Sequence, residues 1–240
     1  MYSVVRRPLF TSFSPSDVAN LAFWFKADQI TGLNDGDTLT TWNDQSGNSR
    51  NVTQGTSTKR PTYKTAILNG LPILRFDGAD DFLKTSSEVS YTATMSVFSV
   101  IKTSTGFASY PLTGIGSVNT FFHEFVSATS WKFSGYNTSN ASNGLDANTI
   151  TSGAWTVLSS MLRSTTCEMY ANGATNGSTA RTGTNNSGNA HLTVGAYGDG
   201  SFGWLNGDLA EVIIYFADIG DTDRQNVQNY LGSKYAITIS

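Results

Sequence analysis

Short runs of β-forming residues alternate with tight-turn dipeptides along most of this sequence, and that alternation restricts the fold more than any other feature. Asn-Gly, Asp-Gly and Ser-Gly pairs supply the positive φ angles that two-residue hairpin turns require. Such pairs fall at 35–36, 46–47, 69–70, 77–78, 134–135, 143–144, 172–173, 176–177, 187–188, 199–200 and 206–207. The runs between them cover 21–27, 37–42, 71–76, 94–103, 119–126, 130–136, 154–163, 167–172, 191–197 and 208–216. Many short strands without interleaved helices predict an all-β sandwich or jelly roll.

The length and charge of the chain fit one such domain. A chain of 240 residues is long enough to bury a large core without disulfides or metals. The net charge is −3, and no basic run is longer than the pair Arg6-Arg7. We therefore expect no nucleic-acid binding. No apolar run approaches the length of a membrane span, so we expect no membrane insertion. The lone Cys167 cannot form an internal disulfide, and we expect it to be buried.

The first 17 residues differ from the rest. Pro8 and Pro15 flank a stretch without the alternation of a strand, which predicts an extended arm over 1–17 ahead of a domain over 18–240. The arm either packs on its own domain or is donated to a neighbouring molecule. It has no apolar signal region, so we expect no export by an ordinary signal. Its candidate assembly residues are Val5, Arg6, Arg7, Leu9, Phe10 and Phe13.

The C-terminal segment breaks the β pattern. Thr222 and Gln225 have the spacing of a capping box, which predicts a helix over 222–235. The helix carries one apolar stripe, at Val227, Tyr230, Leu231 and Tyr235. A single amphipathic helix must cover apolar surface, and we expect it to lie over an edge or an open end of the sandwich.

Four stretches occur in this order: WNDQSGN (42–48), RPTY (60–63), NGLPILRFDGADDFL (69–83) and GDLAEVIIYFADIGDTDRQNVQNYLGSKYAI (207–237). Together they resemble the concanavalin A-like lectin/glucanase superfamily, and more narrowly the laminin G-like domains of bacterial surface and phage virion proteins. The resemblance covers about residues 18–237 and implies a jelly-roll sandwich of two antiparallel sheets with one C-terminal helix. It implies less about activity, because this fold carries enzymes, lectins and structural modules alike.

Glycoside hydrolysis needs two carboxylates that face one bond. Catalytic members of the superfamily that this chain resembles carry Glu-x-Asp-x-Glu along one strand. None of the glutamates here, at 88, 124, 168 and 211, has a carboxylate two residues away. Glu124, beside His123, is the best candidate, but adjacent strand residues face opposite sides. We therefore expect no catalytic residues and no enzymatic activity.

A metal site is conceivable at one turn. Asp77, Asp80 and Asp81 bring three carboxylates together, and such oxygen ligands suit Ca²⁺. Alternatively, these side chains accept hydrogen bonds from turn amides. The resemblance favours the second interpretation, because FDG-x-DD looks like a structural signature of these domains. Apart from Ca²⁺ at this turn, we expect no cofactor.

Three aromatic loops are candidates for sugar binding, because sugar rings stack on exposed aromatic faces. Their residues are Tyr197, Asp199, Phe202 and Trp204; Phe107 and Tyr110; and Trp131 and Tyr136. The alternative for Trp204 is a place under the final helix. The other tryptophans, Trp24, Trp42 and Trp155, lie in strand-like runs and are expected in the core.

These observations lead to one functional hypothesis and two alternatives. The first is a non-enzymatic module on a virion surface, made in the host cytoplasm and acting as a phage capsid decoration or tail fibre protein. It would contact other virion proteins or further copies of itself, and bind host glycans through its aromatic loops. The alternatives are a bacterial extracellular carbohydrate-binding module, and a glycan hydrolase or lyase whose site the sequence does not reveal.

Overall fold

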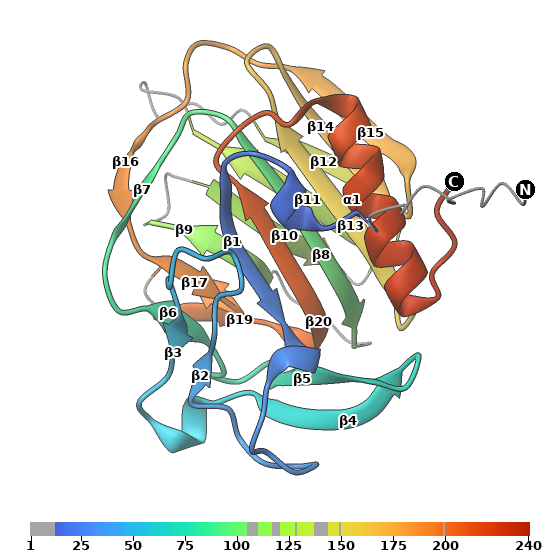
Figure 1. Cartoon of the computed structure of the whole chain (residues 1–240). Coiled ribbons are helices and arrows are strands. Elements are labelled where there is room, and N and C mark those ends of the chain that lie inside the picture. Colours follow the sequence, from blue (N-terminus) through green and yellow to red (C-terminus); the bar gives the residue numbers. More distant parts are fainter. Residues whose placement is uncertain are drawn as a thin grey trace, which may run out of the picture.

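The computed structural model describes residues 13–104, 110–116, 121–127, 129–136, 144–148, 150–198 and 200–240. Two antiparallel sheets make up most of these residues. They also contain one α-helix, α1, which lies beside the strands β13 and β8 in Figure 1. The fold class expected from the sequence, a two-sheet jelly-roll sandwich with one C-terminal helix, is confirmed. None of the described helices is long and apolar enough to cross a membrane.

The first sheet has eight strands. Their order is β15 (Ala174–Ala180), β14 (Thr166–Ala171), β13 (Thr156–Leu162), β8 (Met95–Thr103), β20 (Asn206–Tyr215), β5 (Leu71–Asp77) and β4 (Thr62–Leu68). The eighth, β1 (Leu21–Lys26), pairs with β20. The sequence pattern did not predict β4, whose outward residues 65–67 are all exposed. Asn172 and Gly173 both have positive φ, so the expected hairpin between β14 and β15 is confirmed.

The second sheet faces the first. Its order is β12 (Leu145–Asn148), β11 (Ser130–Gly135), β10 (Phe121–Ser127), β9 (Tyr110–Ile115), β17 (Leu192–Val194), β6 (Leu83–Thr85), β3 (Val52–Thr53) and β2 (Thr41–Trp42). Two strand pairs lie outside both sheets: β16 (Gly188–Ala190) with β7 (Val89–Tyr91), and β18 (Ala196–Tyr197) with β19 (Phe202–Trp204). Short 3₁₀ turns occupy Pro15–Asp17 (η1), Ala27–Gln29 (η2) and Ser57–Lys59 (η3).

The first sheet is apolar on both faces, which explains why a helix is needed. On β8, Val97 and Ile101 belong to the cluster between the two sheets, whereas Phe98 and Val100 belong to a second cluster on the outer face. A strand buried on both sides reads as a continuous apolar run instead of an alternating one. The outer cluster must be covered, because large contiguous apolar patches are rare on soluble domains.

Helix α1 (Gly220–Tyr235) covers that outer cluster. Val227, Leu231 and Tyr235 are buried in it, and Tyr230 packs at its margin, so the predicted apolar stripe is confirmed. The predicted position was wrong, because the helix lies on the outer face of the first sheet and not over an edge or open end. The reason is the second apolar face of the sheet, which period-2 patterning does not reveal.

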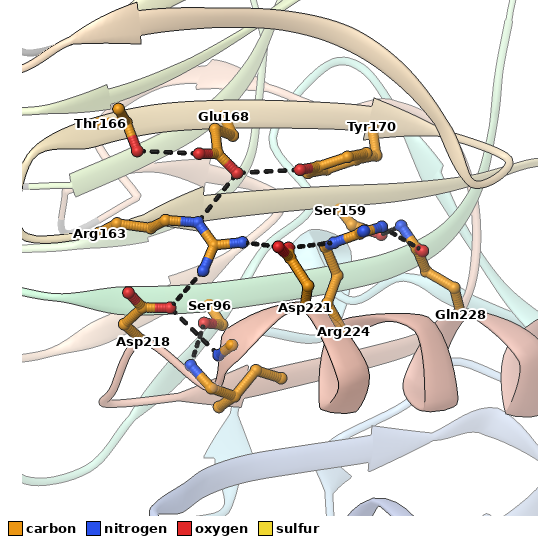
Figure 2. A network of polar contacts seen from close by, with 12 residues as sticks. Ser96, Ser159, Arg163, Thr166, Glu168, Tyr170, Asp218, Asp221, Arg224 and Gln228 are labelled. Atoms are coloured by element: carbon orange, nitrogen blue, oxygen red, sulfur yellow. Dashed lines mark hydrogen bonds and ion pairs between the residues drawn. The ribbon is translucent and has the colours of Figure 1, made fainter.

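The predicted capping box is also wrong. The helix starts two residues earlier than Thr222, and the side chain of its N-cap residue, Ile219, makes no capping hydrogen bond. Asp218 Oδ1 accepts from the Gly220 amide at 3.1 Å instead. Contacts from the sheet set this start, as Figure 2 shows. Ser96 Oγ on β8 accepts from the Ile219 amide at 3.5 Å. Arg163, which directly follows β13, donates to Asp218 at 2.7 Å and to Asp221 at 2.5 Å. Ser96 and Arg163 lie far from the helix in the chain, so the local pattern around Thr222 does not predict this start.

A second polar chain runs along the buried side of α1 (Figure 2). Arg224 lies 3.9 Å from the Tyr170 ring centroid and donates to Gln228 Oε1 at 2.8 Å. Gln228 Nε2 in turn donates to Ser159 Oγ on β13 at 3.0 Å. Both helix side chains are buried, and their polar atoms thereby gain partners in an apolar environment.

One buried carboxylate joins the helix to the sheet. Glu211 on β20 is fully buried. It accepts hydrogen bonds from Trp24 Nε1 at 2.5 Å, Lys234 Nζ at 2.7 Å, Tyr235 Oη at 2.8 Å and Tyr230 Oη at 3.1 Å. Burial, followed by the Glu211 charge, raises the pKa of both tyrosines, so both hydroxyls remain donors. Glu211 therefore links β1, β20 and the last turns of α1.

The segment before the sandwich is docked where the structure describes it. Phe13 packs against the outer cluster, and the buried Pro15 accepts a hydrogen bond from Tyr215 Oη at 2.8 Å. Residues 13–17 therefore contact their own domain, which fits the first alternative for the arm, and a role of Phe13 in assembly stays a prediction. The other predicted assembly residues, Val5, Arg6, Arg7, Leu9 and Phe10, lie outside the described residues. Cys167 is buried as expected, and burial raises the pKa of its thiol to about 12.

Candidate functional site

The hairpin formed by β18 and β19 carries the most exposed aromatic side chain of the described residues. The rings of Tyr197 and Phe202 are stacked, with centroids 4.9 Å apart and an interplanar angle of 23°. Phe202 is 44% exposed, and Ile67 on β4 is the other large hydrophobic side chain so exposed in the described part. We call Tyr197 and Phe202 the aromatic platform.

The chain geometry fixes where this platform lies. Gly195, between β17 and β18, has a φ of +87°, and a Cβ there would lie 2.5 Å from the Phe76 ring. Gly200, at the hairpin tip, also has a φ of +87°, and its Cβ would lie 2.4 Å from the Phe82 ring. Only glycine fits both positions. Trp204 Nε1 donates to the Gly200 carbonyl at 3.2 Å, so this indole belongs to the hairpin and not to the underside of α1.

The acidic turn follows β5. The carboxylate oxygens of Asp77, Asp80 and Asp81 lie within 4.8 Å of one another. Asp77 Oδ1 accepts from the Ala79 amide at 2.8 Å, and Asp81 Oδ2 accepts from the Asp77 amide at 3.0 Å. Turn amides therefore use some of these oxygens, as the alternative interpretation of this turn predicted. The same three side chains are the residues that could hold Ca²⁺, and a calcium site here stays a prediction.

The fold brings the acidic turn and the aromatic platform together. Phe82, against which the hairpin tip packs, follows Asp81 directly in the chain. A Cβ on Gly195 would lie 3.3 Å from the Asp81 carbonyl oxygen. At the other end, the Asn206 side chain lies over Gly78, where a Cβ would be 2.7 Å from it. The hairpin that carries the aromatic platform thus packs against the residues at and after the acidic turn, two features that the sequence suggested separately.

The pH dependence of stability tests the burial of Asp81 in the acidic turn. Burial, and then the Asp77 charge, raises the pKa of Asp81 from 3.8 to about 6. A raised carboxyl pKa means that the folded state gains stability from the protonated form, and this gain is lost as pH rises from about 4 to about 6. Asn cannot ionise, so Asp81→Asn should be more stable than the wild type at pH 7, by about 2–3 kcal/mol. The difference should vanish near pH 4.

Urea unfolding of both proteins across this pH range measures the effect. A constant difference between the two proteins at all pH values would contradict the assignment of Asp81. The same titration with added Ca²⁺ tests the metal prediction. A bound cation would stabilise the wild type at pH 7 and leave Asp81→Asn much less affected.

Two other predicted aromatic residues, Trp131 and Tyr136, lie apart from the platform. Trp131 is fully buried between the sheets, its ring lies 4.8 Å from that of His123, and its Nε1 donates to Asn176. The prediction that Trp131 binds sugar is corrected, because its position in β11 points it into the core. Tyr136 is half-buried, and its carbonyl accepts from the Asn186 amide. Phe107 and Asp199 lie outside the described residues, as does the side chain of Tyr110.

His123 and Glu124 do not form a catalytic pair. Burial lowers the pKa of His123 to about 3, so this side chain is a neutral core residue, with Nε2 3.5 Å from Ser160 Oγ. Glu124 precedes Phe125 on the same strand and is buried. Glu168 pairs with Arg163 at 2.9 Å, and Glu211 pairs with Lys234. Two of the four glutamates thus have structural ion pairs.

These features first define a class: a lectin-like jelly-roll sandwich with an aromatic platform beside an acidic turn. A laminin G-like family model, described as the concanavalin A-like lectin/glucanases superfamily, matches residues 77–219. The chain belongs to this superfamily, as the sequence resemblance implied. The matched range contains both the acidic turn and the hairpin. No curated protein matches the sequence.

Three solved structures are similar in fold. The ligand-binding domain of botulinum neurotoxin serotype D, solved with N-acetylneuraminic acid, has a TM-score of 0.62 at 12% identity over 90% of this chain and 53% of its own. Domain 4 of AbnA, a GH43 extracellular arabinanase from Geobacillus stearothermophilus solved with arabinotriose, has a TM-score of 0.60 at 16% identity over 87% and 97%. A Trypanosoma rangeli sialidase in complex with sialic acid has a TM-score of 0.54 at 11% identity, over 92% of this chain and 34% of its own. This chain therefore spans about half of the neurotoxin chain and a third of the sialidase chain.

Proposed function

We propose that this domain binds carbohydrate at the aromatic platform. The observation that carries the proposal is the exposed ring of Phe202, stacked on the half-buried ring of Tyr197. The apolar C–H face of a sugar ring stacks on such a surface. We expect its hydroxyl groups to meet the accessible carboxylates of the acidic turn, those of Asp77 and Asp80. At Gly195 and Gly200 the hairpin backbone packs closely on the rings of Phe76 and Phe82, and this packing reduces the entropy lost on binding.

The relatives support a role in binding. The neurotoxin domain was solved with N-acetylneuraminic acid and the arabinanase domain with arabinotriose. Both are domains of larger proteins, and the arabinanase domain matches this chain over nearly its whole length. A sandwich that serves as a binding module in a longer protein is therefore a suitable precedent for this chain.

A printed oligosaccharide array identifies the ligand, and one substitution tests the site. Phe202→Ala should weaken binding of the best array ligand by about tenfold or more, which corresponds to about 1.4 kcal/mol. The control is Ile67→Ala, because Ile67 is similarly exposed at 39% and lies on β4. Ile67→Ala should bind like the wild type. Equal affinity of Phe202→Ala and the wild type, or no array ligand at all, would contradict the proposal.

We expect binding without hydrolysis. Glu124 is the best catalytic candidate by sequence, and it is only 8% exposed. Incubation with β-glucan, alginate and agar should therefore produce no new reducing ends. Turnover that disappears in Glu124→Gln, or in Asp81→Asn at the acidic turn, would instead establish an enzyme.

Display on a virion stays a prediction from the sequence, as does self-association. Such a location would present the aromatic platform to glycans of a host cell, and the bacterial extracellular alternative would present it to free or cell-wall polysaccharide. Mass spectrometry of purified particles separates the two settings. A stoichiometric presence in particles supports the virion role, and absence from them supports the carbohydrate-binding module.

A further inference from the structure

Strand β15 is one edge of the first sheet, and its sequence, ATNGSTA, carries no charge and no proline. Ala174, Thr175, Ser178 and Ala180 are exposed. An edge strand presents backbone amides and carbonyls that can pair with another strand. Soluble proteins usually protect such edges with charges, prolines, bulges or a covering loop. The protection at each edge therefore indicates where this domain is open to pairing.

The opposite edge of the same sheet, β4, is covered by its own chain. The Tyr63 amide donates to the Asp37 carbonyl at 2.8 Å, and the Tyr63 carbonyl accepts from the Gly36 amide at 2.9 Å. The Asp35 carboxylate accepts from the Thr65 amide at 2.9 Å. One loop thus uses outward backbone groups of β4 and adds a charge to that edge. The second sheet ends in short strands, β2 with two residues and β12 with four.

The hydrogen-bond pattern of β15 shows which of its backbone groups face outward. Arg181, the residue after β15, donates its amide hydrogen to the Thr165 carbonyl at 2.8 Å. Bonded and non-bonded pairs alternate along an antiparallel ladder, so Ala180 and Ser178 belong to non-bonded pairs with β14. Their amides and carbonyls point away from β14, and no described residue bonds to them. The bulge of β15 lies nearer its start, at Asn176, so the rest of the strand pairs regularly.

The side chains at this edge suit a second copy of the same strand. Antiparallel pairing about Thr179 places Ser178 of each copy opposite Ala180 of the other, so that the outward groups of both copies bond to each other. Both side chains are small and neutral, so neither size nor charge opposes the approach. Glu168, opposite Ser178 on β14, is already paired with Arg163 at 2.9 Å. We propose that β15 of one copy pairs antiparallel with β15 of a second copy, which joins two first sheets into one. We call this contact the seam.

A dimer joined at the seam presents two aromatic platforms. The hairpin that carries the platform packs at the turn after β5, and β5 is five strands away from β15 in the first sheet. Neighbouring strands lie about 4.8 Å apart, so each platform is roughly 24 Å from the seam and the two platforms are about 50 Å apart. Two glycans on one surface can then be bound together, which raises the apparent affinity. This consequence rests on the proposed function, whereas the pairing of β15 does not.

Sedimentation of the full chain at rising concentration tests the pairing. We expect a dimer with a dissociation constant of about 100 µM or tighter. Ser178→Lys/Ala180→Lys places like charges opposite each other across the seam, so it should weaken dimerisation by about tenfold or more. Ser178→Glu/Ala180→Glu should have the same effect. An equimolar mixture of the two variants should restore the dimer, because opposite charges then meet.

The control adds the same charges elsewhere. Asn229→Lys/Ser233→Lys, on the exposed face of α1, should dimerise like the wild type. A wild type that stays monomeric over this range, a Lys variant of β15 that dimerises like the wild type, or a mixture without dimer would each overturn the proposal.

Binding to a glycan-coated surface tests the consequence for function. The Lys variant of β15 should bind such a surface about tenfold more weakly than the wild type or worse, with unchanged affinity for the same free glycan in solution. Equal binding of both proteins to the surface would contradict the two-platform arrangement. A dimer that finds no array ligand would leave the pairing in place and contradict only the proposed function.

Discussion

Glu211→Ala should lower the free energy of unfolding by about 3–5 kcal/mol, the usual loss when one partner of a buried charge pair is removed. The carboxylate is fully buried and accepts from Trp24, Tyr230 and Tyr235 as well as from Lys234. Without it, the indole and both hydroxyls lose an acceptor in an apolar environment, where water cannot replace it. Urea unfolding at constant pH measures the change.

Asp28→Asn is the matched control for Glu211→Ala. Asp28 Oδ1 accepts from the same ammonium, Lys234 Nζ, at 2.9 Å, but the Asp28 side chain is 20% exposed. Water can solvate the site after this change, so the loss should stay at about 1 kcal/mol or less. If both substitutions cost the same, burial of Glu211 is not the source of its effect.

Leu231→Ala should destabilise the protein by about 2–5 kcal/mol, the range for truncation of a buried leucine. Leu231 is fully buried between α1 and the outer face of the first sheet. The loss has two parts, the transfer of the removed methyl groups and the cavity that remains. Thermal and urea unfolding should agree on its size, because the helix is part of the same cooperative domain.

Thr222→Ala serves as the control for Leu231→Ala. The sequence pattern made Thr222 the helix cap, and a lost cap would cost about 1 kcal/mol. In the structure Thr222 lies inside the first turn and is not the N-cap residue. Thr222→Ala should therefore leave the free energy of unfolding almost unchanged. If Thr222→Ala lowered the free energy of unfolding by as much as a lost cap does, and Leu231→Ala lowered it only slightly, the observed helix start and helix packing would be contradicted.

The helix shows what sequence patterns predict well and what they do not. The stripe of Val227, Leu231 and Tyr235 is a local periodicity, and it predicted the buried face. At the start of the helix lie contacts from Arg163, just after β13, and from Ser96 on β8, and both residues are far away in the chain. A capping box can be recognised locally, but it does not form when distant side chains fix the start elsewhere.

In the candidate site, too, local features could be predicted from the sequence and contacts between distant segments could not. The acidic turn and the aromatic hairpin could each be predicted, because Asp clusters and aromatic-glycine loops are local features. Their proximity depends on the pairing of β17 with β6, where Thr193 lies opposite Lys84. Only the sheet order provides that information. Trp131 was mispredicted for a related reason, since a strand side chain points inward or outward according to its register.

We propose that binding depends on the aromatic platform, whereas stability depends on the helix. The most direct test measures calorimetric binding of the best array glycan to Phe202→Ala and Leu231→Ala, at a temperature at which both are folded, and compares their unfolding free energies. We predict that Phe202→Ala loses at least about tenfold in affinity, while its unfolding free energy stays within about 0.5 kcal/mol of the wild type. Leu231→Ala should keep the wild-type affinity and lose unfolding free energy. Wild-type affinity in Phe202→Ala together with lost binding in folded Leu231→Ala would contradict the claim and move the binding site to the helix.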